Sequence, residues 1–239
     1  MVRPLYRLPA GVSCEPKGDG HRGLWYDKFC DRWTTGWDLK SAGGNLNPKL
    51  AWIEKATNGK VGSETALADY AERLYNLVTR RGGAVLVGVA QSRFVTGLGR
   101  SHPTENGFAW HPTLGTPYLP GSSLKGLTKA WAREAGYGEE ADRVLGGPGQ
   151  AGTVAFLDAV PVRPVDLEAD VLTPHYANWT KDDPPGDWRS PIPVPYLVAA
   201  SGTSLLFGLI PAGQAGGDDV ALARQWLVAA LDEFGVGAK

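Results

Sequence analysis

Two stretches of the chain repeat apolar residues at helical spacing. In residues 63–81 (SETALADYAERLYNLVTRR), Leu67, Tyr70, Leu74 and Leu77 recur every three or four positions. The leading serine is a good N-cap, and the glycine pair after the stretch ends a helix. The pattern therefore predicts a helix over 63–81 with one apolar face available for packing.

The second stretch is GDDVALARQWLVAALDEFG, residues 217–235. Asp218 is placed to cap a helix there, and Gly235 is placed to end it. The apolar face would comprise Val220, Leu227, Leu231 and Phe234. A shorter helix is predicted over about 122–136, with Leu124, Leu127 and Trp131 toward the core.

Three other stretches have the composition and length of strands. Residues 84–99 begin with the β-branched run AVLVGV, and residues 152–162 and 203–211 are further apolar runs. The two longest loops, 100–121 and 170–195, are rich in proline. Loops of this length inside a compact domain are usually functional or held by a partner.

The predicted order is strand, helix, strand, strand, helix, which is most of a βαββαβ ferredoxin-like (RRM-related) unit. We therefore expect an α+β fold in a single domain over 1–239. Residues 1–82 would form a mostly irregular and helical N-terminal extension, and 83–239 a ferredoxin-like core with long loop insertions. The fourth strand would follow residue 235, so either the chain continues or another segment closes the sheet.

The entry to the helix at 122–136, PYLPGSSLKG, has the features of an anion-binding site. Ser122 and Ser123 fall where backbone N–H groups lack helical partners, and Lys125 adds a positive charge. With Lys129 and Arg133, Lys125 forms a basic stripe at i, i+4 and i+8. Arg93 and Arg100 could add charge nearby. The alternative is a capped surface helix with a solvated basic face.

Loop residues offer weaker candidates. His102 and His111 could serve as general acid and base in RNA cleavage, or could simply bind backbone carbonyls. Aromatic residues in the loops could stack on bases or anchor the loops: Trp110, Tyr118, Tyr176, Trp179 and Trp188. The terminal FGVGAK places Gly235, Gly237 and Lys239 where a backbone could approach a phosphate, or merely ends a helix.

Composition narrows the function classes. The net charge of −1 over 239 residues means that any nucleic-acid site is a local patch. Two cysteines, Cys14 and Cys30, are too few for a disulfide scaffold or a zinc site, and no carboxylate spacing marks a two-metal site. No apolar run reaches 18 residues. We expect a cytoplasmic protein with no cofactor, no metal, no membrane span and no small-molecule substrate.

Three separated segments resemble the RAMP superfamily of CRISPR proteins, and within it the sixth-subunit family of the type III-B (Cmr) effector. They are 97–133, the pair DVLTPHYANW (170–179) and PPGDWRSPIPVPYL (184–197), and the terminal FGVGAK. The resemblance covers about 84–239. RAMP glycine-rich loops usually continue beyond the point where FGVGAK stops.

The resemblance implies a ferredoxin-like core that binds CRISPR RNA without cutting it, near the 3′ end of the guide. Its implied partners are guide RNA, target RNA and the other Cmr RAMP subunits, in antiviral defence. The implied RNA contacts are Ser122, Ser123, Lys125 and Lys129 of the helix at 122–136. The alternative is a metal-independent endoribonuclease that processes CRISPR RNA, with His102 or His111 as general base.

Overall fold

The computed structural model describes residues 20–33, 38–39, 47–174, 191–213 and 218–236. Both helices and antiparallel strands are present, which confirms the α+β prediction. The elements in chain order are α1 Arg22–Lys28, α2 Pro48–Ala56, α3 Glu64–Arg80, β1 Ala84–Val89, β2 Ser101–His102, β3 Glu105–Asn106, α4 Gly121–Glu134, α5 Gly138–Leu145, β4 Val154–Phe156, β5 Val160–Pro161, β6 Leu167–Leu172, β7 Val194–Ala199, β8 Ser204–Pro211 and α6 Asp219–Glu233.

The main sheet is organised around β8, the third of the strands predicted from the sequence. Strand β8 pairs antiparallel with β1 on one side and with β4 and β5 on the other. Its first six residues, SLLFGL, are all buried. A central strand with both faces covered reads as a continuous apolar run rather than an alternating one.

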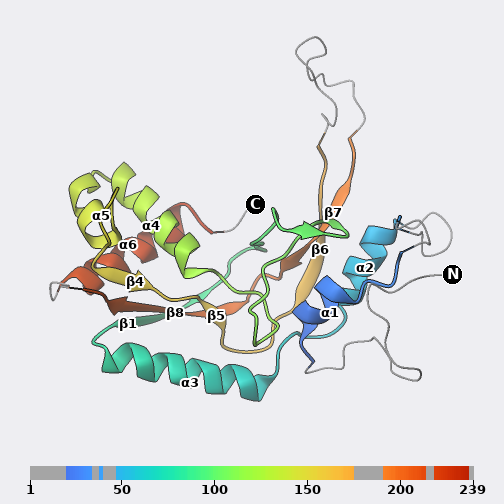
Figure 1. The fold of residues 1–239 in the computed structure, drawn as a ribbon, viewed down its shortest axis with the longest axis horizontal. Helices are drawn as coiled ribbons and strands as arrows, with labels where there is room; N and C mark the ends of the chain where they lie inside the picture. The colour runs from blue at the N-terminus through green and yellow to red at the C-terminus, as the bar shows by residue number, and fades with distance from the viewer. Residues whose placement is uncertain (1–19, 34–37, 40–46, 175–190, 214–217, 237–239) are drawn as a thin grey trace, which may run out of the picture.

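Helices cover both faces of this sheet (Figure 1). Helix α3 lies along one face, where Leu74 and Val78 pack against Val160 and Leu206. Helices α4 and α6 cover the other face, and the indole N–H of Trp131 in α4 donates to Glu233 of α6 at 2.8 Å. The helix predicted at 63–81 is therefore an integral layer over the sheet.

Within the two long helices, some predicted inward positions prove wrong. Leu77 and Phe234 are 46% and 44% exposed, whereas Val78 is fully buried. An α-helix has about 3.6 residues per turn, so Val78 rather than Leu77 returns to the face of Leu67 and Leu74, and the heptad-like spacing selected the wrong neighbour. The predicted N-cap of α6, Asp218, makes no side-chain cap bond.

The strand predicted over 203–211 matches β8, whereas the other two strand predictions are right in place but too long. Strand β1 ends at Val89 rather than reaching residue 99, and its outward valines, Val87 and Val89, are 60% and 51% exposed. The stretch predicted as one strand over 152–162 is two short strands, β4 and β5. Between them, Leu157 still donates to Gly208 of β8 at 2.9 Å, whereas Ala159 pairs with Leu119. Asp158 lies between these two residues and accepts a hydrogen bond from the start of α4.

A second sheet was missed. Strands β6 and β7 form an antiparallel hairpin with pairs from Leu167↔Ala199 to Leu172↔Val194, where 170–195 was predicted as a loop. The run VPYLVA has strand chemistry, but the prolines around it masked the signal. Helix α2 packs on this hairpin.

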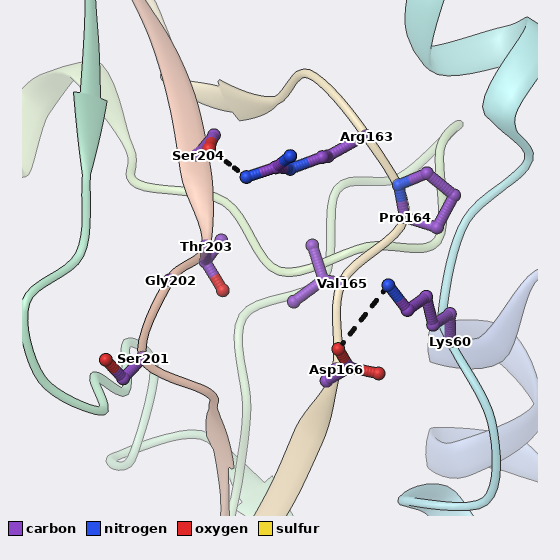
Figure 2. A pocket seen from close by; sticks show the side chains of 9 residues that line it. All are labelled: Lys60, Arg163, Pro164, Val165, Asp166, Ser201, Gly202, Thr203 and Ser204. Atoms are coloured by element: carbon purple, nitrogen blue, oxygen red, sulfur yellow. Dashed lines mark hydrogen bonds and ion pairs between the residues drawn. The ribbon is translucent and has the colours of Figure 1, made fainter.

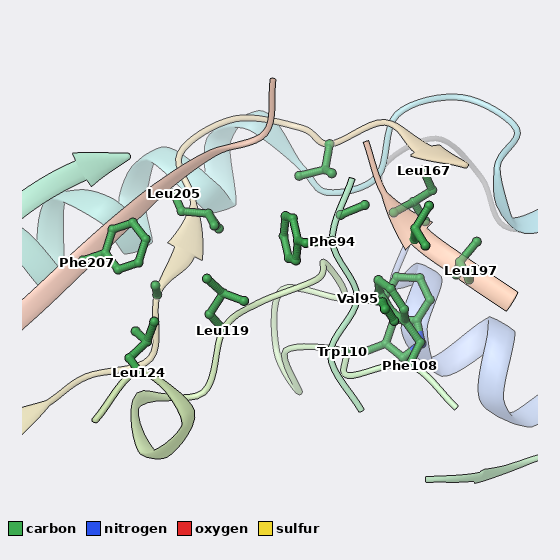
Figure 3. Close-up of a cluster of buried hydrophobic side chains, with 14 of the residues drawn as sticks. Phe94, Val95, Phe108, Trp110, Leu119, Leu124, Leu167, Leu197, Leu205 and Phe207 are labelled. Carbon is green, nitrogen blue, oxygen red and sulfur yellow. The ribbon is translucent and has the colours of Figure 1, made fainter. Parts of the chain in front are cut away.

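The loop over 100–121 is largely buried and joins the two sheets. Phe108 and Trp110 pack beside Val95 and Leu197, while Leu119 lies nearer the main sheet (Figure 3). Trp25 of α1 stacks on Trp52 of α2 at 4.2 Å between ring centroids, which extends the same core into the N-terminal helices. One hydrophobic core therefore runs from α6 to α1.

The last strand of the predicted βαββαβ unit would follow α6, and the described residues end at Val236. That part of the ferredoxin-like interpretation stays a prediction. Among the helices described, none is both long and apolar enough to cross a membrane.

Candidate nucleic-acid interface

Helix α4 begins with an unusually tight backbone contact. The N–H of Gly121 donates to the Asp158 carboxylate at 2.7 Å. A Cβ at position 121 would lie 2.2 Å from the carbonyl oxygen of Phe156, so only glycine fits. Asp158 thus occupies part of the anion-binding position at the helix start that the sequence assigned to a ligand. The sequence could not show that Asp158 binds the start of α4, because Asp158 is 37 residues away from Gly121 along the chain.

The rest of the helix entry faces solvent. Ser122 and Ser123 are exposed, and the first turn contains no acidic side chain. Lys125 is half-buried and is the fifth residue of α4, so it begins the second turn rather than lying on the first. No carboxylate in the described part of the chain forms an ion pair with Lys125. These three side chains remain available to an external anion.

The other two residues of the basic stripe are engaged within the protein. Lys129 Nζ and Arg133 Nη2 both lie 2.8 Å from the same carboxylate oxygen of Asp142 in α5. Lys129 also donates to the carbonyl of Gly146. Hydrogen bonds from Lys129 and Arg133 hold the pKa of Asp142 below its usual range. The stripe therefore ties α4 to α5 as well as presenting charge.

Of the two arginines predicted to add charge, Arg93 is paired within the protein and Arg100 faces solvent. Arg93, just after β1, lies 3.6 Å from Asp170 and 3.8 Å from Glu168 of β6, so its charge is matched inside the protein. Arg100 is exposed at the start of the buried loop. Burial raises the pKa of nearby Asp27, and Lys28 and Arg100 oppose that rise. Of this pair, Arg100 is the one open to a partner.

A further basic surface lies on α3 and was missed in the sequence. Arg73, Arg80 and Arg81 are exposed, and with Asn76 and Leu77 they line a surface depression of about 510 Å³. Within the described residues, none of the three arginines forms an ion pair. Their spacing of i, i+7 and i+8 on a predicted helix could have indicated this shared basic face.

The two loop histidines are held in hydrogen bonds. His102 Nε2 donates to the carbonyl of Tyr26 at 3.2 Å, and its Nδ1 accepts from the Thr104 hydroxyl at 2.8 Å. Its ring stacks on Tyr26 with centroids 4.3 Å apart. Burial lowers the pKa of His102 to about 4, although the bond to Tyr26 acts in the opposite direction. His102 is therefore neutral at pH 7.

His111 forms hydrogen bonds within the turn that follows it in the chain. Its Nδ1 accepts from the backbone N–H groups of Leu114 at 3.3 Å and Thr113 at 3.4 Å. The ring lies edge-on to Tyr70 and Tyr118, with centroids 5.2 and 5.5 Å away. Burial lowers the pKa of His111, and the Asp158 charge opposes that shift. His111 is therefore held by packing and by backbone N–H groups, whereas the predicted bond to a backbone carbonyl is made by His102.

The remaining candidate contacts are the loop aromatic residues and the terminal glycines and lysine. Trp110 is 5% exposed in the core, so its ring offers no face for a base, while Tyr118 is half-buried against His111. Gly235 has φ +72°, the left-handed conformation of a residue that ends a helix, here α6. Outside the described residues lie Tyr176, Trp179, Trp188, Gly237 and Lys239.

Among the described residues, no group of three or more His, Cys, Asp or Glu side chains is arranged to hold a metal ion. Cys30 is buried and free, and burial raises the pKa of its thiol to about 11. The Cys30 thiol is therefore protonated at neutral pH, and its side chain packs in the core.

Comparison with known proteins places this arrangement in a family. The family model described as "RAMP superfamily" matches residues 72–239. The chain belongs to the RAMP superfamily. The match takes in the main sheet, the second hairpin and the C-terminal half of α3.

Two curated relatives of this RAMP protein are both named Cmr6, as the resemblance predicted. The Pyrococcus furiosus protein is 26% identical over 220 residues, covering 62% of this chain and 63% of the relative. The Saccharolobus solfataricus protein is 30% identical over 105 residues, covering 43% and 36%. The chain thus spans less than two thirds of the length of either relative.

A solved structure shares the fold. A chain in a cryo-EM structure of the type III-B Cmr-beta complex bound to cognate target RNA aligns with a TM-score of 0.59 at 22% identity. The alignment covers 73% of this chain and 63% of that chain.

Proposed function

We propose that this RAMP protein is a non-catalytic RNA-binding backbone subunit of a type III-B CRISPR effector in the cytoplasm. It would contact the 3′ region of the guide RNA and neighbour other Cmr subunits and target RNA. The names of both curated relatives and the fold shared with a Cmr-beta chain support the assignment. A ferredoxin-like core is part of the proposal, supported by the antiparallel strand order β1-β8-β4.

The observation that carries RNA binding is the solvent-facing start of α4. Two hydroxyl groups, from Ser122 and Ser123, lie at the positive end of this 14-residue helix. Lys125 adds a cation that has no ion pair among the residues that the structure describes. Contacts of this type bind phosphates without reading sequence. Sequence selection would then come from base pairing by the guide, as in other RNA-guided systems.

The decisive variant is Lys125→Glu. Affinity for a guide-length single-stranded RNA should fall by about tenfold, since replacing a cation by an anion at a phosphate contact costs about 1.4 kcal/mol or more. The slope of log K against log salt should become shallower by about 0.7–1.4, the share of one to two phosphates. Filter binding over a series of salt concentrations measures both quantities.

Arg224→Glu is the matched control, because Arg224 is an exposed arginine on α6 with the opposite face of that helix buried. It makes nearly the same charge change without touching α4. Equal RNA affinities for Lys125→Glu and Arg224→Glu would contradict the α4 interface.

The non-catalytic part is supported by the two histidines, whose rings are tied to backbone groups. Repeat RNA incubated with the wild-type protein in EDTA should stay intact. Cleavage that disappears in His111→Ala would instead establish the endoribonuclease alternative.

A further inference from the structure

A polar pocket of about 280 Å³ lies away from the α4 surface. It forms where the β5–β6 connection, the β7–β8 turn and the loop before α3 meet (Figure 2). Arg163 and Lys60 project into it from two of these segments, and Ser204 of β8 lies at its inner wall. No residue of α4 takes part.

The guanidinium of Arg163 uses one of its donors within the protein. Its Nη2 donates to Ser204 Oγ at 3.0 Å, and the arginine is otherwise exposed. A guanidinium carries five N–H donors in a rigid fork, so most remain for a ligand. Ser204 is 6% exposed and accepts the bond from Arg163, so its own hydroxyl proton can point into the pocket. The bond also orients the fork.

The backbone next to Lys60 is held in place by hydrogen bonds. Val61 and Val165 exchange two backbone hydrogen bonds of 2.8 and 3.0 Å, which hold the lysine loop against the β5–β6 connection. The one nearby carboxylate, Asp166, lies 3.7 Å from Lys60 Nζ, and both side chains are more than 60% exposed. An ion pair so long and solvated is weak, so it competes poorly with a ligand anion.

We propose that this pocket binds a phosphoryl group. Two cations and one carboxylate leave a formal charge of +1 among the lining residues, and the two cations come from separate walls of the pocket. An arginine fork suits two phosphate oxygens, and a lysine supplies a point charge to a third. The phosphoryl group belongs either to a free or terminal phosphate or to the backbone of a nucleic-acid strand.

Three probes distinguish these sources: inorganic phosphate, a nucleoside 5′-monophosphate, and a short oligouridine with a 5′-hydroxyl end. Calorimetric titration of the full chain is compared with Arg163→Gln and Lys60→Gln. At least one probe should bind the wild type, and Arg163→Gln should weaken that probe about tenfold. Binding of the first two probes assigns a terminal or free phosphate; binding of the oligonucleotide alone assigns a backbone phosphate.

Arg224→Gln is the control for lost charge, and unchanged thermal unfolding of all variants checks their folding. Wild-type and Arg163→Gln titrations that coincide for every probe would overturn the pocket proposal, as would no binding of any probe. Lys125→Glu, tested in parallel, keeps the two proposals separable. Oligonucleotide binding that is lost in Lys125→Glu but retained in Arg163→Gln leaves the α4 interface standing, and it removes the pocket when phosphate and monophosphate binding are also unchanged in Arg163→Gln.

Discussion

Single residues decide how the candidate interface is built. Gly121 and Asp158 show that the start of α4 is served by a carboxylate of its own chain, which leaves Ser122, Ser123 and Lys125 for a partner. Lys129 illustrates the opposite outcome, since a basic stripe that looked uniform in the sequence contains a residue committed to Asp142. Periodicity places a side chain on a helix face but does not reveal which distant carboxylate meets it.

His102 gives a prediction at this scale. Its folded-state pKa of about 4 lies below the unfolded value near 6.5, so the unfolded chain binds the proton more tightly. The stability that His102 contributes is present above pH 6.5 and is lost as the pH falls toward 4. At pH 5 the loss is about 2 kcal/mol of unfolding free energy.

Urea unfolding of wild type and His102→Asn at pH 7.5 and pH 5 measures this difference. The variant should start less stable, because the Tyr26 carbonyl loses its ring donor, but should lose less on acidification. The same decrease between the two pH values in both proteins would show that another group is responsible.

At the scale of elements, strong periodicity predicted well and turn-rich segments did not. The helices α3, α4 and α6 and the strands β1 and β8 stand near their expected positions because each has a clear apolar pattern. Prolines masked the β6–β7 hairpin. In the loop over 100–121, the anchoring alternative for the aromatic residues holds for Trp110, but the sequence did not show that the loop would form part of the core. Its burial depends on contacts with both sheets, which no local window of sequence contains.

Helix α3 allows a matched test of which residues face the sheet. Val78→Ala removes two buried methyl groups between α3 and β8 and should cost about 2 kcal/mol of unfolding free energy. Leu77→Ala removes a larger but exposed side chain and should change stability by about 0.5 kcal/mol or less. Denaturant unfolding of the pair measures both. If Leu77→Ala proved the more destabilising, the orientation of α3 over the sheet would be wrong.

At the scale of the whole molecule, the main sheet as described ends at β1 on one side and at β4 and β5 on the other. Among the described residues, no strand pairs with the outer side of β1, which contains no charged residue or proline. A largely apolar groove of about 510 Å³ lies between β1 and the end of α6, and Phe94 and Phe207 are among its lining residues. An uncharged, exposed edge strand is a template for pairing with another strand.

This chain should therefore self-associate through β1 as its concentration rises. Val89→Lys, which places a charge on the 51%-exposed outer end of β1, should suppress the association without loss of thermal stability. Tyr75→Lys is the control, because Tyr75 is equally exposed on α3, where no backbone edge is open. Sedimentation velocity over a range of concentrations separates the cases. Association that Tyr75→Lys suppresses as strongly as Val89→Lys would point to general surface hydrophobicity, and a wild type that stays monomeric throughout would show that the β1 edge is protected.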